Sequence, residues 1–249
     1  MDSQSPNNSP AHSFFPLTIT IKRIVHLSHI IDPTIPLWPG DPSVEFETVA
    51  ELDQDGYNLR RFSLGEHSGT HMNAPNSFYP QGMSIDQYPA ESLIAQAVVI
   101  DIRQQAATHP DYVLTISDVL AWEQEYGQIP PKSVVLLFTG WQSKWSDKRA
   151  FFNQDASGRM HFPGFGSDAT QFLLKERQIA GVGIDTHGVD SGQDTTLATN
   201  HLVLEQPRIV LENLTNLDQL PASGTILVIG ILRLLGGTGS PVAVLALVS

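Results

Sequence analysis

The sequence predicts an α/β protein that folds as a single domain around one layered core, on three observations. Segments with β-strand composition recur along the whole 249-residue chain, whereas helical patterns are fewer and fall mainly in its second half. No internal repeat, low-complexity linker or break in composition divides the chain. We therefore expect one domain over residues 17–249, preceded by a loose polar arm over residues 1–16.

The predicted strands are rich in β-branched or aromatic residues. In chain order they are Leu17–Ile21, Ile24–Leu27, Val44–Thr48, Leu59–Leu64, Ala97–Ile102, Ser133–Phe138, Ala180–Ile184, Arg208–Leu211, Thr225–Ile231 and Val242–Leu247. Continuous apolar runs at Ala97–Ile100, Val134–Phe138 and Ile226–Leu232 predict strands that are buried on both faces. Residues 59–64 alternate in polarity instead, which predicts one face in water.

Three helices are predicted, and each has a boundary signal. Their ranges are Asp118–Tyr126, Asp168–Glu176 and Thr196–Glu205. Ser117 and Ser167 are the expected N-caps of the first two, and Pro207 follows the end of the third.

Composition excludes several classes of function. The chain has 26 acidic and 14 basic residues and no basic run, so we expect no nucleic-acid partner. It has no cysteine, so any metal must be bound by His, Asp, Glu or Asn side chains. No apolar run reaches the roughly 18 residues of a membrane helix, and the N-terminus lacks a signal-peptide pattern. We expect a cytoplasmic protein with a small-molecule substrate.

The densest polar segment runs from residue 65 to residue 78. His67 and His71 are four residues apart, but Gly69 between them and Pro75 after them argue against a helix. In a tight loop the two rings can converge on one metal ion. The alternative is a pair of histidines without a ligand in a polar loop.

A second polar cluster follows the predicted strand that ends at residue 184. It contains Asp185 and His187, while His201 lies on the third predicted helix and Glu212 ends the next strand. A carboxylate at the end of an apolar strand is costly unless it is paired or bound to metal. The alternative is that Asp185 and Glu212 accept hydrogen bonds from buried backbone groups.

These segments resemble the metal-dependent cyclase family, which includes bacterial kynurenine formamidase and isatin hydrolase. The family signature is His-x-Gly-Thr-His-x-Asp-x-Pro-x-His, and residues 67–77 read His-Ser-Gly-Thr-His-Met-Asn-Ala-Pro-Asn-Ser. Further similarity lies in residues 35–41, in the Glu212-Asn213-Leu214 triplet and in the glycine-rich residues 236–242. The resemblance extends from about residue 23 to the end of the chain.

The resemblance implies a fold, a cofactor and an assembly. The fold is a mixed, twisted, partly barrel-like sheet with helices packed outside, and members commonly form dimers or tetramers. The implied ligands of a divalent ion, Zn²⁺ or Mn²⁺, map onto His67, His71, Asn73, His201 and Glu212. A metal-bound water then attacks the carbonyl of an amide or lactam.

Two positions depart from the family signature. Asn73 replaces the Asp that bridges two metals, and its neutral amide predicts one ion at most, or weaker binding of the second. Ser77 replaces the last His, the family's proton shuttle, and an alcohol needs an activating partner to act as a base. His187 is a second candidate for the proton relay.

We therefore expect a metal-dependent hydrolase of a small amide, lactam or ester, with Trp38 and Phe78 lining an aromatic substrate pocket. The alternative is a catalytically impaired family member that retains a small-molecule or metal binding pocket. A purely structural oligomeric protein is the third hypothesis, and it would make His67 and His71 dispensable.

Overall fold

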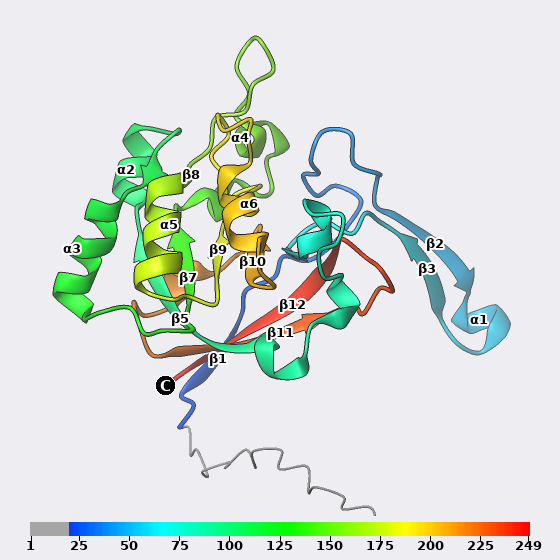
Figure 1. Ribbon diagram of the computed structural model, residues 1–249. Coiled ribbons are helices and arrows are strands. Elements are labelled where there is room, and N and C mark those ends of the chain that lie inside the picture. The colour runs from blue at the N-terminus through cyan, green and yellow to red at the C-terminus, as the bar shows by residue number, and fades with distance from the viewer. Residues whose placement is uncertain (1–19) are drawn as a thin grey trace, which may run out of the picture.

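The computed structural model describes residues 20–249 (Figure 1). The predicted arm over residues 1–16 lies outside this range, as do the first three residues of the predicted strand Leu17–Ile21. The first strand of the described chain, β1, begins at Arg23.

A closed mixed β-barrel forms the centre of the molecule. Its strands are β4 (His71–Asn73), β5 (Ile94–Asp101), β7 (Val134–Phe138), β9 (Gly181–Ile184), β10 (Ile209–Glu212), β11 (Thr225–Ile231) and β12 (Gly239–Val248). The strand order is β12-β11-β5-β7-β9-β10-β4, and β4 pairs with β12 to close the ring. β1 (Arg23–His26) adds to β12 outside the ring. The prediction of an α/β fold with a mixed, barrel-like sheet is confirmed.

Alternate residues of the central strands enter two separate cores. Val99 and Leu136 belong to one apolar cluster, and their neighbours Val98 and Val135 belong to the cluster that packs under the helices. β5 and β7 therefore have both faces covered, as predicted. For Ile226–Leu232 that prediction is wrong: burial alternates along β11. No residue of β11 joins the helix-side cluster, so its outer face stays partly open.

The principal helices lie on one side of the barrel (Figure 1). They are α2 (Arg103–Thr108), α3 (Ile116–Tyr126), α4 (Lys148–Phe152), α5 (Ser167–Glu176) and α6 (Ala198–Leu204). Short 3₁₀ turns cover Pro75–Ser77, Ile85–Gln87, Ala90–Leu93, Trp141–Lys144 and Leu217–Gln219, and β6 (Val113–Leu114) pairs with β8 (Gly164–Phe165). None of the helices in residues 20–249 has the length and apolar character needed to cross a membrane.

The three predicted helices exist, but their first residues differ from the prediction. Thr115, not Ser117, caps α3, because its hydroxyl and the Asp118 carboxylate form a reciprocal capping box. Ser167 is the first helical residue of α5, and Gly166 is its cap. α6 begins only at Ala198, because Leu197 before it has a positive φ of 52°.

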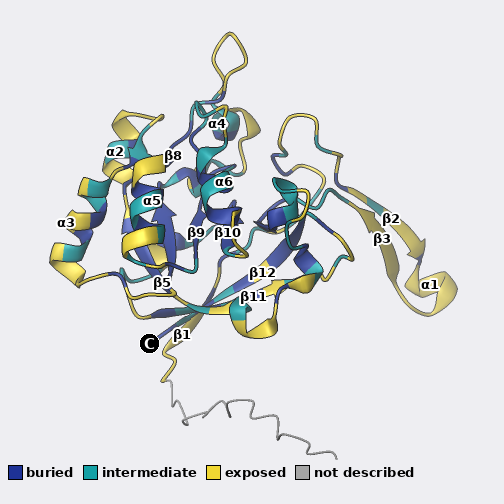
Figure 2. Cartoon of the chain, viewed as in Figure 1, coloured by how far each residue is buried: buried dark blue, intermediate teal, exposed yellow. Residues whose placement is uncertain are grey.

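A hairpin projects from the barrel at the opposite end from α2 and α3 (Figure 1). It consists of β2 (Glu45–Ala50), the single turn α1 (Leu52–Asp55) and β3 (Leu59–Ser63), and we call residues 45–63 the hairpin arm. β2 and β3 pair with each other and with no other strand of residues 20–249. Every residue of β3 is exposed, so the prediction of one buried face is wrong for this strand (Figure 2).

Candidate active site

The signature segment forms a turn that leads into the strand closing the barrel. Gly69 has a φ of +67°, and its carbonyl accepts a hydrogen bond from the side chain of Asn213. His71 then starts β4, which lies between β10 and β12. The register places His71 opposite Glu212 on β10. Strand closure, not helical spacing, therefore brings these two side chains together.

His71 and Glu212 form a buried pair. His71 Nε2 lies 3.0 Å from Glu212 Oε2, and both residues are at most 5% exposed. His71 Nδ1 lies 2.9 Å from the Gly69 carbonyl, which can only accept, so Nδ1 carries a proton. Burial works to raise the pKa of Glu212, but hydrogen bonds from His71, Val189 and Asn200 outweigh it and hold the pKa below its usual value.

Two amides extend this pair into a buried network. Asn73 Nδ2 donates to Glu212 Oε2 and to Asn200 Oδ1, each at 3.1 Å. Asn200 Nδ2 donates to Glu212 Oε1 at 3.2 Å and to Asp190 Oδ2 at 2.9 Å. Burial raises the pKa of Asp190 to about 6 despite these donors. Both oxygens of Glu212 are thus occupied by N–H donors from the protein.

His67 lies at the edge of the network and connects it to β12. Its Nδ1 is 2.9 Å from Asn73 Oδ1, and its Nε2 is 3.0 Å from the Thr238 hydroxyl. Thr238 in turn donates from its amide and hydroxyl to Glu66. Burial, followed by the neighbouring His71, lowers the pKa of His67. Ser77 Oγ donates to the Thr238 carbonyl at 2.5 Å. This hydroxyl therefore links the 3₁₀ turn of residues 75–77 to the residue before β12.

His201 is not part of the network. Its ring packs against the rings of Phe78 and Tyr79, with centroid distances of 4.8 and 5.7 Å. The buried residues of α6 are Thr199, Asn200, Val203 and Leu204, so its inner face carries Asn200. Successive helical residues point about 100° apart, so neighbours 200 and 201 cannot both face the barrel. The sequence prediction named His201 and not Asn200, although the spacing of residues 200, 203 and 204 indicates the inner face of this helix.

His187 lies in an aromatic surrounding beside the network. The rings of Phe151, Phe152, Phe162 and Trp38 have centroids 4.4 to 5.9 Å from its own. Its Nε2 is buried without a hydrogen-bond partner in the described residues. Burial lowers the pKa of His187 to about 3, which makes the ring neutral at pH 7. A hydrogen-bonding role toward a ligand therefore suits this residue better than the role of a base.

Asp185 holds the backbone that supports this region. Its carboxylate accepts hydrogen bonds from the amide and hydroxyl of Thr139 and from the amide of Gln142. Complete burial raises its pKa to about 6. Of the two interpretations that the sequence left open for Asp185, the structure favours the buried acceptor of backbone donors.

The donor set can be compared with the divalent ion that the family resemblance implies. Within residues 20–249, no three His, Cys, Asp or Glu side chains are grouped so that they could hold a metal ion. Asn73 turns N–H groups toward Glu212, and His201 faces Phe78 and Tyr79. These side chains therefore do not fit the divalent ion that the family resemblance implies.

Comparisons with known proteins agree with the fold and the signature segment. The family model described as "Putative cyclase" matches residues 25–191. The chain is 36% identical to isatin hydrolase of Roseibium aggregatum, over 91% of this chain and 92% of that protein. It is 25% identical to kynurenine formamidase of Salinibacter ruber, over 88% of this chain and 94% of that protein.

Solved structures give the same result. Isatin hydrolase A from Labrenzia aggregata, bound to benzyl benzoate, aligns with a TM-score of 0.85 and 36% identity, covering 91% of this chain and 93% of that one. A more distant structure, titled a potential metal-dependent hydrolase with cyclase activity, aligns at 20% identity with a TM-score of 0.69 and shows the fold alone. The family model matches most of the chain, and isatin hydrolase of Roseibium aggregatum aligns along nearly all of it. The protein therefore belongs to the cyclase family of hydrolases.

Proposed function

We propose that this protein hydrolyses the C–N bond of a small lactam or amide attached to an aromatic ring. The 36% identity to isatin hydrolase over 91% of the chain carries this proposal. In the reaction, water adds to the carbonyl carbon, the C–N bond breaks, and the leaving nitrogen takes a proton. The products are a carboxylate and an amine, joined in one molecule when the substrate is a lactam.

The buried pair supplies groups that can move the proton. His71 Nδ1 is fixed as a donor to Gly69, so one further proton is shared between His71 Nε2 and Glu212 Oε2. A positioned acid–base pair of this kind contributes roughly 10²- to 10⁴-fold to a hydrolytic rate. Asn73 and Asn200 keep the Glu212 carboxylate in place. His187 remains a candidate catalytic or substrate-orienting residue.

Aromatic side chains near the network favour a planar substrate. Trp38 is 43% exposed and lies edge-on to His187, at a centroid distance of 5.9 Å. Phe78, directly after the signature segment, contacts the ring of His201. Flat ring systems with one polar edge bind well in such surroundings, where carbonyl oxygens are met by a few placed donors.

The proposal is tested with purified protein and a small panel of substrates, isatin and formanilide, with and without added Mn²⁺ or Zn²⁺. We expect ring opening of isatin, a loss of at least about 100-fold in His71→Gln and Glu212→Gln, and little change in His161→Gln. His161 is a matched control because it pairs with Asp111 and Asp155 on the surface. No turnover of either substrate under any metal condition would overturn the proposal.

A second candidate is a family member that binds such molecules without hydrolysing them. Asn73 and Ser77 favour it, because the structure engages both in hydrogen bonds with neighbours. In that case isatin should quench the tryptophan fluorescence of the wild type, and should quench that of Trp38→Phe less. Recovery of unchanged isatin would then support binding without turnover.

A further inference from the structure

His187 is a buried imidazole with one ring nitrogen that is not hydrogen-bonded. The residue is 5% exposed, and its Nε2 has no partner among the described residues. A neutral imidazole has one N–H donor and one lone pair, and a buried polar group that stays unpaired is unfavourable. Beside a candidate active site, such a nitrogen indicates that a ligand supplies the missing partner.

The position of His187 relates it to the buried pair of the site. In residues 20–249 the other ring nitrogen that is buried without a partner is His29 Nε2. Burial lowers the pKa of both histidines, but the charges of the Glu212–His71 pair also act on the pKa of His187. For His29 burial is the only cause. Val189, two residues after His187, donates its amide to Glu212 Oε1 at 2.9 Å. The turn that carries His187 is therefore fixed to the carboxylate of the pair.

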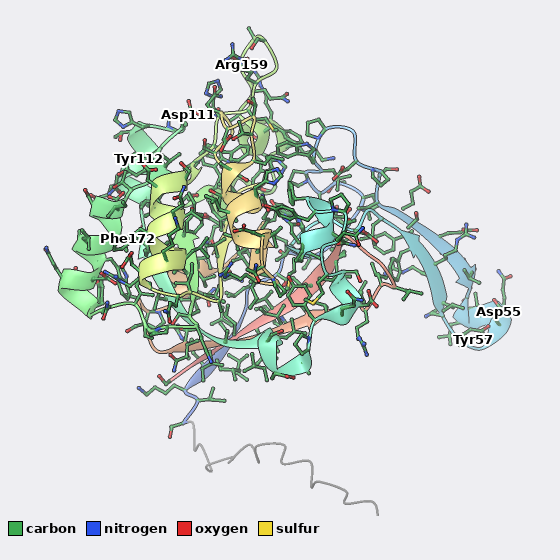
Figure 3. The ribbon with its side chains drawn as sticks, in the orientation of Figure 1. Asp55, Tyr57, Asp111, Tyr112, Arg159 and Phe172 are labelled. Atoms are coloured by element: carbon green, nitrogen blue, oxygen red, sulfur yellow. The ribbon has the colours of Figure 1, made fainter. Side chains whose placement is uncertain are left out.

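Three of the rings around His187 come from the two ends of one loop. α4 contributes Phe151 and Phe152 before the loop, and Phe162 follows it. An antiparallel bridge closes the base of the loop, and its tip, marked by Arg159, projects away from the barrel (Figure 3). The three rings belong to one apolar cluster, so they form a packed wall around the imidazole.

Trp38 forms a further side of this enclosure and differs from the wall in its exposure. It is 43% exposed, whereas Phe151 and Phe162 are at most 1% exposed. A ligand therefore reaches His187 Nε2 from the Trp38 side. Apolar walls around a single polar atom lower the local dielectric, so one hydrogen bond to a developing charge is strong there.

The proposed hydrolysis needs a donor for the negative charge that develops on the carbonyl oxygen. The side-chain N–H groups of Asn73 and Asn200 are already bound to oxygens of the network. The amide and hydroxyl of Thr238 both donate to Glu66. The Nε2 of His187 has no such partner in the described chain, so it is available to substrate.

We propose that His187 Nε2–H donates to the oxygen of the hydrolysed carbonyl and stabilises the oxyanion that forms there. This inference rests on the proposed function and makes His187 a catalytic residue. Water adds to the carbonyl carbon and gives a proton to the His71–Glu212 pair, while the C=O electron pair moves onto oxygen. The carbonyl then forms again, the C–N bond breaks, and the nitrogen takes the bonding electrons and the proton from the pair. A neutral imidazole suits this task, because it donates a hydrogen bond and keeps its proton.

The test compares wild type, His187→Phe, His187→Gln and His109→Phe on whichever of isatin and formanilide the wild type hydrolyses. His187→Phe should lower kcat at least about 100-fold and change KM less than about 3-fold, because the donor acts on the oxyanion. His187→Gln keeps a side-chain N–H and should recover at least about 10-fold of this loss. His109→Phe is the matched control, since it makes the same replacement at an exposed position after α2 and should leave kcat unchanged.

A thio analogue of the same substrate gives a readout that a purely structural role would not change. Sulfur replaces the oxygen of the hydrolysed carbonyl and accepts hydrogen bonds weakly. His187→Phe should therefore slow hydrolysis of the thio analogue at least about 10-fold less than that of the parent substrate. Equal losses on both substrates, or wild-type kcat in His187→Phe, would overturn this inference and leave the proposed function intact. Absence of hydrolysis by the wild type would overturn both.

Discussion

At position 73 an amide side chain takes part in three hydrogen-bond contacts, and a carboxylate could not make the two in which the amide donates. Asn73 donates two N–H bonds, to Glu212 and Asn200, while its oxygen faces His67. A carboxylate there would face the Glu212 carboxylate without a donor between them, and like charges in a buried site are unfavourable unless a cation joins them. An amide at position 73 therefore suits a network in which the Glu212 carboxylate is bound by N–H donors.

Asn73→Asp should therefore increase the affinity for Mn²⁺ or Zn²⁺ by at least about 10-fold, because it adds a charged ligand beside His67 and His71. Titration calorimetry and metal content after dialysis check this. Asn76→Asp is the control, because it adds the same charge in the neighbouring 3₁₀ turn, where the Asn76 amide bonds only the Gly236 carbonyl. Equal metal uptake by wild type and Asn73→Asp would contradict the expectation.

His29 is a second residue whose environment has a measurable consequence. Its ring stacks on Trp145 at 3.9 Å, its Nε2 has no partner in the described chain, and burial lowers its pKa to about 4. In the unfolded chain the His29 imidazole binds a proton near pH 6.5, whereas in the folded chain it does so only near pH 4. The free energy of unfolding should therefore fall as the pH drops through this window.

His29→Phe should reduce the loss of unfolding free energy between pH 7 and pH 4 by about 2 kcal/mol, a value that allows for the partial exposure of the ring. Phenylalanine keeps the stack on Trp145 and loses no hydrogen bond of the ring. Urea unfolding of both proteins at pH 7 and pH 4 gives the comparison. A pH dependence identical to that of wild type would show that His29 does not titrate on unfolding.

At the scale of elements, the sequence predicts the apolar strands of the barrel well. It does not predict the short polar strand β4. β5 and β7 are found where continuous apolar segments predict strands buried on both faces, because burial on both faces requires apolar residues at successive positions. β4 has only three residues and a polar sequence, and partners from β10 and β12 determine it. Local composition contains no signal for such a strand.

The candidate site shows the same division. His67, His71 and Asn73 are close in sequence and lie together, and Glu212 joins them because β10 pairs with β4. Residue type favours His201 as a ligand, whereas the helical phase of α6 places Asn200 in the network beside Glu212. Thr238 could be found only through the closure of the barrel, which places β12 beside β4.

The N-terminus of α3 gives an element-scale prediction. Thr115→Ala removes the hydroxyl that accepts from the Asp118 amide at 3.2 Å, and should reduce the free energy of unfolding by about 1 kcal/mol. Ser117→Ala, at the exposed position that sequence alone favoured as the cap, should change it by less than about 0.5 kcal/mol. Urea titration distinguishes the two, and equal losses would reject Thr115 as the cap.

At the scale of the whole molecule, the closure of the barrel and the candidate site depend on one glycine. A Cβ on Gly239 would lie 2.6 Å from His67 Cε1 and 2.9 Å from the Met72 carbonyl oxygen. Real atoms do not approach so closely, so a side chain there must push His67 away or open the pairing of β12 with β4. The first residue of β12 therefore has to be small.

Gly239→Ala should cost about 1–3 kcal/mol of unfolding free energy and lower any hydrolytic activity in the same protein. Gly230→Ala is the control, since its Cβ would meet Ala243 only at 3.4 Å and beyond. Thermal unfolding and the isatin assay together measure both effects. Wild-type stability and turnover in Gly239→Ala would show that this contact can relax freely.

β12 contacts β1, β11 and β4, so the strand nearest the end of the chain joins the first strand to the signature segment. Thr238, directly before it, bonds His67 and accepts from the Ala74 amide. During synthesis, His67, His71 and Glu212 therefore precede β12, the strand that positions them, in order along the chain. A fragment that ends before residue 238 lacks Thr238 and β12, and we expect it to have no hydrolytic activity.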